Sequence, residues 1–223
     1  MDKQQEYMKD YWKHMTMTLT KAMYIVDTSN RDWNLDEFLI KGKNTWDMIY
    51  NNIKNDIVDY DNILEIGCGL GRILLSTVDK FKESYGVDID EGMINFAKKI
   101  RDDKNLGMPI YDVVDGTGSL SLYKDNFFSN IFSFICFQHI PYLDVQQKYI
   151  MEIERILKPG GIATLLIQNL NWRGSNNDIN FGRGMSIAEL ENVTGKLKVI
   201  RRDDGPAFSP DDRNYWVILK KEI

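Results

Sequence analysis

The stretch Ile63-Leu64-Glu65-Ile66-Gly67-Cys68-Gly69-Leu70-Gly71-Arg72 decides the fold. It opens as a short apolar strand, Ile63–Ile66, and runs into a turn in which every second residue is glycine. Glycines let the backbone turn sharply and let a ligand approach without interference from a Cβ atom. In open α/β sheets, such a turn at the carboxyl end of a parallel strand is where ligands bind. The stretch therefore predicts an α/β fold with a binding site at this turn.

The residues that follow continue the same alternation of strands and helices. Apolar strands bordered by amphipathic helices indicate a parallel sheet that is covered on both faces. Two last strand candidates have no helix between them, so they are expected to pair as an antiparallel hairpin at one sheet edge. The expected strands are Ile63–Ile66, Tyr85–Ile89, Ile110–Val114, Asn130–Phe137, Ile162–Gln168, Leu197–Arg201 and Tyr215–Leu219, and the expected helices are Arg72–Phe81, Glu91–Ile100 and Val145–Leu157.

The first 55 residues or so differ from the rest, because their sequence pattern predicts helical and irregular structure. Asn34 is a candidate cap for a short helix that reaches Leu39, and a further helix is expected from Thr45 to Ile53. We predict one domain, residues 1–223, with residues 1–55 as a helical N-terminal cover and 56–223 as the core. The fold class is a Rossmann-like, doubly wound, mostly parallel sheet with a C-terminal antiparallel hairpin.

Composition narrows the function. The chain has 223 residues, 43% hydrophobic and 27% charged, as in an ordinary globular protein. No apolar run approaches the ~20 residues needed to cross a bilayer, so we expect no membrane association and a cytoplasmic location. The net charge of −5 argues against a nucleic-acid partner, since such proteins usually carry a basic stripe. With two cysteines and two histidines, no set of metal ligands is expected.

Acidic residues at the ends of the next two strands indicate which class of ligand binds at the turn. Asp88 lies seventeen residues after Gly71, across one helix, where an acid can accept hydrogen bonds from both hydroxyls of a ribose. Asp115 ends the third strand, where an acid can receive an adenine amino group. The glycine spacing is Gly-x-Gly-x-Gly, and a dinucleotide fingerprint would need another glycine at the position of Arg72. The turn is therefore not tailored to a pyrophosphate, and a nicotinamide oxidoreductase is disfavoured.

Residues 62–169 together resemble the class I S-adenosylmethionine-dependent methyltransferases. The resemblance rests on the acidic glycine motif from Glu65 to Gly71, on Asp88, and on Asp115. A segment after the fourth strand, Gln138-His139-Ile140-Pro141, and the stretch Arg155–Gly161 after the next helix complete it, and they point to the small-molecule type. The sequence departs from its relatives at Asn130, where they often have aspartate.

The resemblance implies S-adenosylmethionine as cofactor, S-adenosylhomocysteine as product and a small molecule as methyl acceptor. Backbone atoms of the glycine turn would approach the methionine moiety and ribose, Ile89 would pack on adenine, and Gln138 would lie beside the methyl donor. The cofactor-binding candidates are Glu65, Gly67, Cys68, Gly69, Gly71, Arg72, Asp88, Ile89, Asp115, Gly116 and Gln138.

His139 is the catalytic candidate, because an imidazole near neutrality suits general-base work. It would take the proton of a hydroxyl acceptor, which slightly favours O-methylation of a sugar or other hydroxylated metabolite. Two other roles stay open for His139, capping the following helix and ordering the cofactor loop. Methylation of a small amine and a non-catalytic binding module also stay open, because alignment alone supplies much of the rate in such a displacement.

Acceptor selectivity is expected from the segments that border the strand ends. These are the N-terminal region and the loop Gln168–Arg183, which is rich in hydrogen-bond donors. The candidates are Tyr11, Trp12, Asn169, Trp172 and Arg173. Tryptophans 12, 33 and 46 have an alternative role as core anchors of the helical cover.

Overall fold

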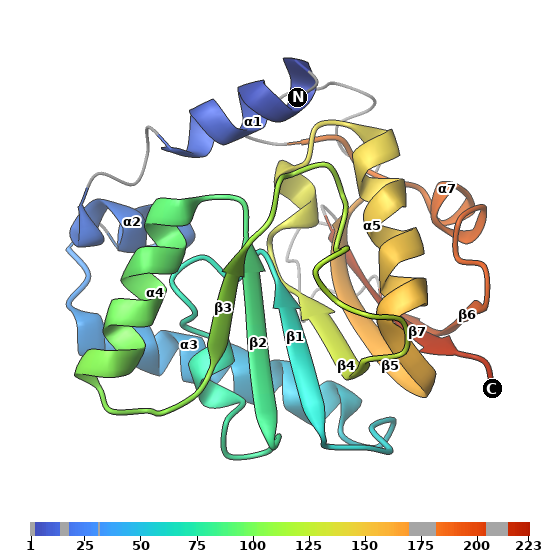
Figure 1. The fold of residues 1–223 in the computed structure, drawn as a ribbon, viewed down its shortest axis with the longest axis horizontal. Coiled ribbons are helices and arrows are strands. Elements are labelled where there is room, and N and C mark those ends of the chain that lie inside the picture. The colour runs from blue at the N-terminus through green and yellow to red at the C-terminus, as the bar shows by residue number, and fades with distance from the viewer. Residues whose placement is uncertain (1–2, 14–17, 31, 170–181, 204–213) are drawn as a thin grey trace. The chain divides into compact units, whose positions relative to one another are not determined.

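A computed structural model describes residues 3–13, 18–30, 32–169, 182–203 and 214–223 of the chain. Figure 1 shows its helices and strands as a ribbon. Its contacts divide into two compact units. The first unit comprises Met1–Asp56 and Tyr60–Gly116, and the second Ile57–Asp59 and Thr117–Ile223.

The first unit is built on three parallel strands, β1 (Asn62–Ile66), β2 (Glu83–Asp88) and β3 (Ile110–Val113). The central strand, β2, pairs with β1 on one side and with β3 on the other. Four helices accompany them: α1 (Lys3–Lys13), α2 (Leu19–Val26), α3 (Leu35–Ile53) and α4 (Glu91–Asp103). Helix α4 begins at its cap Asp90, whose side chain accepts a hydrogen bond from the Met93 N–H.

Helix α3 corrects the expectation of two separate helices, because residues 35–53 form one helix of 19 residues. Asn34 caps it as predicted, accepting a hydrogen bond from the Glu37 N–H at 2.9 Å. Gly42, in its middle, does not break it. A Cβ atom at this position would collide with the carbonyl group of Arg72, so the glycine is where the helix meets the segment after the glycine turn.

The predicted helix Arg72–Phe81 is wrong, since these residues form turns around a short 3-10 helix, η1 (Leu74–Ser76). The N–H groups of Ser76 and Thr77 donate to carbonyls only three residues back. The Thr77 hydroxyl also donates to the Leu74 carbonyl at 2.7 Å and lies 2.7 Å from the Ser84 hydroxyl on β2. These buried side-chain contacts compete with the α-helical pattern.

The second unit contains β4 (Phe128–Ser133), η2 (Phe137–His139), α5 (Leu143–Ile156) and β5 (Leu157–Gln168). Strand β4 ends before Phe137, earlier than predicted, and Ile135 then adopts a positive φ of 52°, a strained conformation for a β-branched residue. Strand β5 starts at Leu157 rather than at the predicted Ile162. Its register with β4 shifts between Phe128 and Asn130, so the Pro-Gly-Gly stretch is absorbed as an irregularity within the strand.

The C-terminal hairpin is confirmed. Strands β6 (Leu197–Asp203) and β7 (Asn214–Lys221) pair antiparallel, and β7 also pairs antiparallel with β5. A short helix, α7 (Ile187–Glu191), precedes them behind a capping box made by Ser186 and Glu189. In the described residues, the strands of the first unit are parallel, and the second unit pairs β4 and β5 in parallel with antiparallel strands at its C-terminal end, so the predicted fold class is confirmed. Among the described residues, no helix is both long and apolar enough to cross a membrane.

Candidate functional site

The glycine turn after β1 has the geometry that its sequence demands. Gly67, Gly69 and Gly71 have φ values of 75°, 51° and 72°, in the region that side chains rarely adopt. The N–H groups of Gly67 and Cys68 both donate to the Val87 carbonyl, at 2.8 and 3.0 Å. The turn is therefore fixed to the end of β2, and its backbone is left bare of side chains at every second residue.

Asp88, at the end of β2, ties this turn to the next one. Its Oδ2 accepts a hydrogen bond from the Gly69 N–H at 2.8 Å, and its Oδ1 accepts one from the Asp90 N–H at 3.0 Å. Burial raises the pKa of Asp88 to about 6, although these backbone hydrogen bonds oppose the rise. Each oxygen of an ionised carboxylate can accept more than one hydrogen bond, so the group can hold the turn and still receive hydroxyls.

Glu65 and Tyr111 form a buried polar row beneath the turn. Both pair with Gly86, on either side of β2, so they stand at one level of the sheet. Burial raises the pKa of Glu65 well above its usual range, against the opposing effect of Arg72. Its Oε2 atom and the Tyr111 hydroxyl find no hydrogen-bond partner among the described residues. Buried polar atoms are rarely left without a partner, and an ammonium group at this point would favour the ionised form of Glu65 and pair with it.

Glycines at positions 86 and 71 allow close packing around the turn. A Cβ atom on Gly86 would meet Cys68 Sγ at 2.9 Å, and one on Gly71 would collide with the Tyr111 hydroxyl. The Tyr111 hydroxyl therefore lies directly against the glycine turn, a contact that the sequence analysis did not foresee.

Arg72 is buried and turns toward the helical cover. Its Nη1 donates to the Thr45 hydroxyl at 3.2 Å, its Nη2 lies 3.8 Å from Asp27 Oδ2, and the guanidinium stands over the Phe38 ring. Burial lowers the pKa of Arg72, while Asp27 and Glu65 raise it. Arg72, one of the cofactor-binding candidates, thus pairs with an acid of this chain, and this pairing links the turn to α2 and α3.

The helical cover packs on the same turn. Val26 of α2 lies against Gly69, where a Cβ atom would be 3.1 Å from its methyl group. Trp46 is buried, and Trp33 packs edge-on against Phe38 and donates from its indole to the Asp27 carbonyl at 2.8 Å. Trp33 and Trp46 are thus anchors of the cover, the role that the sequence analysis gave as an alternative.

The expected adenine rim lies at the ends of β2 and β3. Gly116 has a φ of 76° and packs so closely on Ile89 that a Cβ atom would collide with the Ile89 side chain. Ile89 is half-buried and Asp115 is exposed. A residue that sequence reasoning missed also reaches this point: Met8 of α1 is buried, with its methyl group beside Gly116.

Gln138 and His139 lie in the second unit, in η2. The Gln138 amide nitrogen is 3.1 Å from His139 Nε2. Gly182, where the described chain resumes, lies directly against the Gln138 carbonyl, so that a Cβ atom at this position would collide with the carbonyl. The C-terminal part of the loop that was expected to select the acceptor therefore contacts the expected catalytic segment.

Gln146 of α5 holds these two segments together, and sequence reasoning missed it. Its side chain is fully buried, and its amide nitrogen lies 2.7 Å from the carbonyls of Ile140 and Arg183 and 3.3 Å from that of Phe137. In the sequence, the signal for it is a glutamine at a position on the apolar face of an amphipathic helix.

The acceptor candidates are only partly placed. Tyr11 and Trp12 of α1 are half-buried and pack edge to face, with ring centroids 5.2 Å apart. Asn169 is half-buried after β5, whereas Trp172 and Arg173 lie outside the described residues. Among the residues described, no cluster of His, Cys, Asp and Glu is arranged to hold a metal ion.

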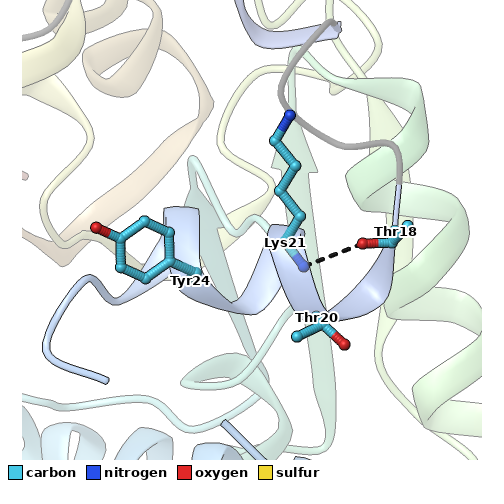
Figure 2. Close-up of a pocket in the computed structure, with 4 residues that line it drawn as sticks. All are labelled: Thr18, Thr20, Lys21 and Tyr24. Atoms are coloured by element: carbon cyan, nitrogen blue, oxygen red, sulfur yellow. Dashed lines mark hydrogen bonds between the residues drawn. The ribbon is translucent and has the colours of Figure 1, made fainter. Parts of the chain in front are cut away.

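Figure 2 shows a shallow pocket on α2, lined by Thr18, Thr20, Lys21 and Tyr24. The Lys21 backbone N–H donates to the Thr18 hydroxyl at 3.2 Å, which caps the helix. All four residues belong to one short helix and its cap, and none is a predicted site residue.

Comparisons with known proteins agree with this geometry. Residues 64–165 match a family model described as a methyltransferase domain. A probable methyltransferase, ltbC, of Aspergillus luteorubrus is 32% identical over 109 residues, which are 46% of this chain and 38% of the relative. Phosphoethanolamine N-methyltransferase 2 of Caenorhabditis elegans is 26% identical over 157 residues, 66% of this chain and 35% of the relative. The chain thus spans little more than a third of the length of these two relatives.

A solved structure extends the likeness over most of the fold. An S-adenosylmethionine-dependent methyltransferase from Clostridium acetobutylicum superposes with a TM-score of 0.67 at 16% identity, covering 80% of this chain and 91% of that one. At this identity the likeness shows the fold. Residues 64–165 thus match the methyltransferase-domain family, and this family together with the fold implies S-adenosylmethionine as the cofactor.

Proposed function

We propose that this chain transfers the methyl group of S-adenosylmethionine to a small polar molecule and releases S-adenosylhomocysteine. The observation that carries the proposal is Asp88. One carboxylate, at the end of a parallel strand, holds the glycine turn through the Gly69 N–H and keeps lone pairs for a ribose.

The residues around the turn fit an adenosyl cofactor. Bare glycine backbone allows close approach, the Glu65 Oε2 atom has no described hydrogen-bond partner and suits an ammonium group, and Ile89 offers an apolar surface. The cofactor supplies a methyl group on a positively charged sulfur. A lone pair of the acceptor forms the new bond to this carbon as the carbon–sulfur bond breaks, and the sulfur becomes a neutral thioether.

His139 is proposed to take the proton when the acceptor is a hydroxyl, which slightly favours O-methylation. The contact with the Gln138 amide supports a neutral imidazole whose Nε2 lone pair accepts a hydrogen bond, with the proton on Nδ1. To act as base, Nε2 has to exchange the amide for the acceptor hydroxyl. In this proposal the Gln138 amide first holds His139 in the neutral form with the lone pair on Nε2, and the acceptor hydroxyl then replaces the amide at this atom.

Two alternatives predict different results. A small amine is the alternative acceptor, and one relative of this chain is named a phosphoethanolamine N-methyltransferase. A neutral amine needs no base, so N-methylation predicts that His139→Ala changes turnover little. A non-catalytic binding module would keep the glycine turn and Asp88 and would bind cofactor without turnover.

Calorimetry with S-adenosylmethionine, S-adenosylhomocysteine and NADH is the first test. Binding of the two adenosyl ligands and no binding of NADH is expected, while no adenosyl binding by folded, cofactor-free protein would refute the proposal. Production of S-adenosylhomocysteine is then measured with panels of sugars, hydroxylated metabolites and amines. His139→Ala should slow turnover on a hydroxyl acceptor and leave S-adenosylhomocysteine affinity unchanged; a loss of affinity would instead place His139 among the cofactor contacts.

A further inference from the structure

Met8 is a buried residue in a mostly polar helix. Helix α1 reads Lys-Gln-Gln-Glu-Tyr-Met-Lys-Asp-Tyr-Trp-Lys, and the Met8 side chain is only 4% exposed, whereas its neighbour Tyr7 is 51% exposed. In Figure 1, α1 lies beyond the carboxyl ends of β2 and β3. The burial of Met8 shows that this side chain docks the helix there.

The contact made by Met8 is specific. Its methyl carbon would lie 3.6 Å from a Cβ atom on Gly116, and the same Cβ atom would collide with the Ile89 side chain. The thioether therefore packs over the bare Cα face of Gly116, next to Ile89. All three residues belong to the first unit, and Ile89 directly follows Asp88.

This place coincides with the position that the proposed function gives to adenine. A ribose held by Asp88 puts its base close to the next residue along the chain, Ile89, and to the turn at Gly116. An apolar, flexible thioether adapts to irregular gaps and makes favourable contacts with aromatic rings. Methionine at this point suits a wall that accepts a flat ring.

We propose that Met8 is a cofactor-binding residue, and that the Met8 thioether of α1 lies against the adenine ring beside Ile89, as part of the same apolar wall. The inference rests on the proposed function. It assigns to the N-terminal helix a contact with the cofactor, in addition to its expected role toward the acceptor.

The composition of α1 makes its docking depend on this contact. Tyr11 and Trp12 lie three and four residues after Met8, on the same face of the helix, and most of the other residues are polar. An isolated helix of 11 residues is marginal in water, so packing contacts such as that of Met8 contribute to its stability. A ligand that contacts Met8 therefore stabilises the docked helix, and docking in turn strengthens the binding of that ligand.

The test follows the methionine methyl groups by NMR in protein carrying ¹³C-methyl methionine, with adenosine as the probe. Met8→Leu identifies the Met8 signal by its absence. Met151, which is 48% exposed on α5 in the second unit, serves as the internal control. On titration, the Met8 signal should move through the ring current of adenine and saturate at the dissociation constant measured by calorimetry, while the Met151 signal stays in place.

Affinity provides the second readout. Met8→Ala should weaken adenosine binding between about two- and tenfold, the range expected for loss of one sulfur–aromatic contact. The affinity of Met8→Leu should lie between those of the wild type and Met8→Ala, because leucine keeps the apolar volume but lacks the sulfur. Circular dichroism and thermal unfolding check that each variant is folded.

The outcomes separate the two proposals. Adenosine binding with an unmoved Met8 signal, or with an affinity unchanged in folded Met8→Ala, would overturn the role of Met8 and leave the proposed function standing. Failure of adenosine and S-adenosylhomocysteine to bind the folded wild-type protein would refute both.

Discussion

Lowering the pH from 8 to 5 should weaken the binding of adenosine about tenfold, because Asp88 loses its charge over this range. Its pKa is raised to about 6 by burial. A carboxylate accepts hydrogen bonds from both ribose hydroxyls, whereas a protonated carboxyl has lost part of this capacity. At pH 5 only about one molecule in eleven carries the ionised group, and the apparent affinity falls with that fraction.

The same shift has a cost for the folded protein. When an acid has a higher pKa in the folded than in the unfolded state, the folded protein loses stability as the pH rises from the unfolded pKa to the folded pKa. For Asp88 the interval runs from the ordinary value of 3.8 to about 6, and the difference corresponds to about 3 kcal/mol. The contribution of Asp88 to the free energy of unfolding should therefore be largest below pH 4 and smallest above pH 6, where the ribose is bound best.

Isothermal calorimetry with adenosine at pH 5, 6, 7 and 8 measures the effect. Adenosine keeps the ribose and lacks the amino acid part, so the titration of Glu65 does not enter. Asp88→Asn should bind weakly and equally at every pH. Asp90→Asn is the matched control, since asparagine also caps a helix; it should keep the pH dependence, with a midpoint moved to lower pH because the Asp90 charge raises the Asp88 pKa. A wild-type affinity that is constant between pH 5 and 8 would refute the assignment of the ribose to Asp88.

Two further predictions concern packing. Gln146→Met should change the imidazole ¹⁵N signals of His139, because the carbonyls of Phe137, Ile140 and Arg183 lose their donor. The control, Gln147→Met, removes a hydrogen bond to Glu189 from the same helix and should leave these signals unchanged. Equal spectra for the two variants would contradict the role of Gln146. Gly42→Ala should lower the melting temperature, because the new Cβ atom would strike the Arg72 carbonyl, although alanine favours a helix by about 1 kcal/mol over glycine. The control, Asn44→Ala at an exposed position of α3, should raise the melting temperature. A higher melting temperature in both variants would show that the helix can move away from Arg72.

The strands and the glycine turn could be predicted because their signals are local. Ile63–Ile66 is apolar, the following glycines need positive φ, and Asp88 ends a second apolar strand. The errors arose where distant contacts decide the conformation. Residues 72–81 have a helical pattern, but the Thr77 hydroxyl is engaged by the Leu74 carbonyl and by Ser84 on β2, and the residues form turns instead.

Long-range contacts also explain the site residues that were missed. Met8 and Gln146 each lie in a helix whose pattern was readable, yet their roles depend on partners that the sequence does not name. Met8 meets Gly116, more than a hundred residues later, and Gln146 meets the Arg183 carbonyl. A buried polar residue on an apolar helix face and a single buried thioether on a polar helix are the patterns that point to such contacts.

The position of β7 constrains how the protein is made. In the second unit this strand lies between β5 and β6, although it is the last of the three along the chain. Strand β6 therefore leaves the ribosome before the neighbour that it needs, and β5 exposes one edge until residues 214–221 have been synthesised. Chains that stop before residue 214 should be poorly soluble, because an unpaired apolar edge recruits other chains. Translation has to pass residue 221 before the second unit can close.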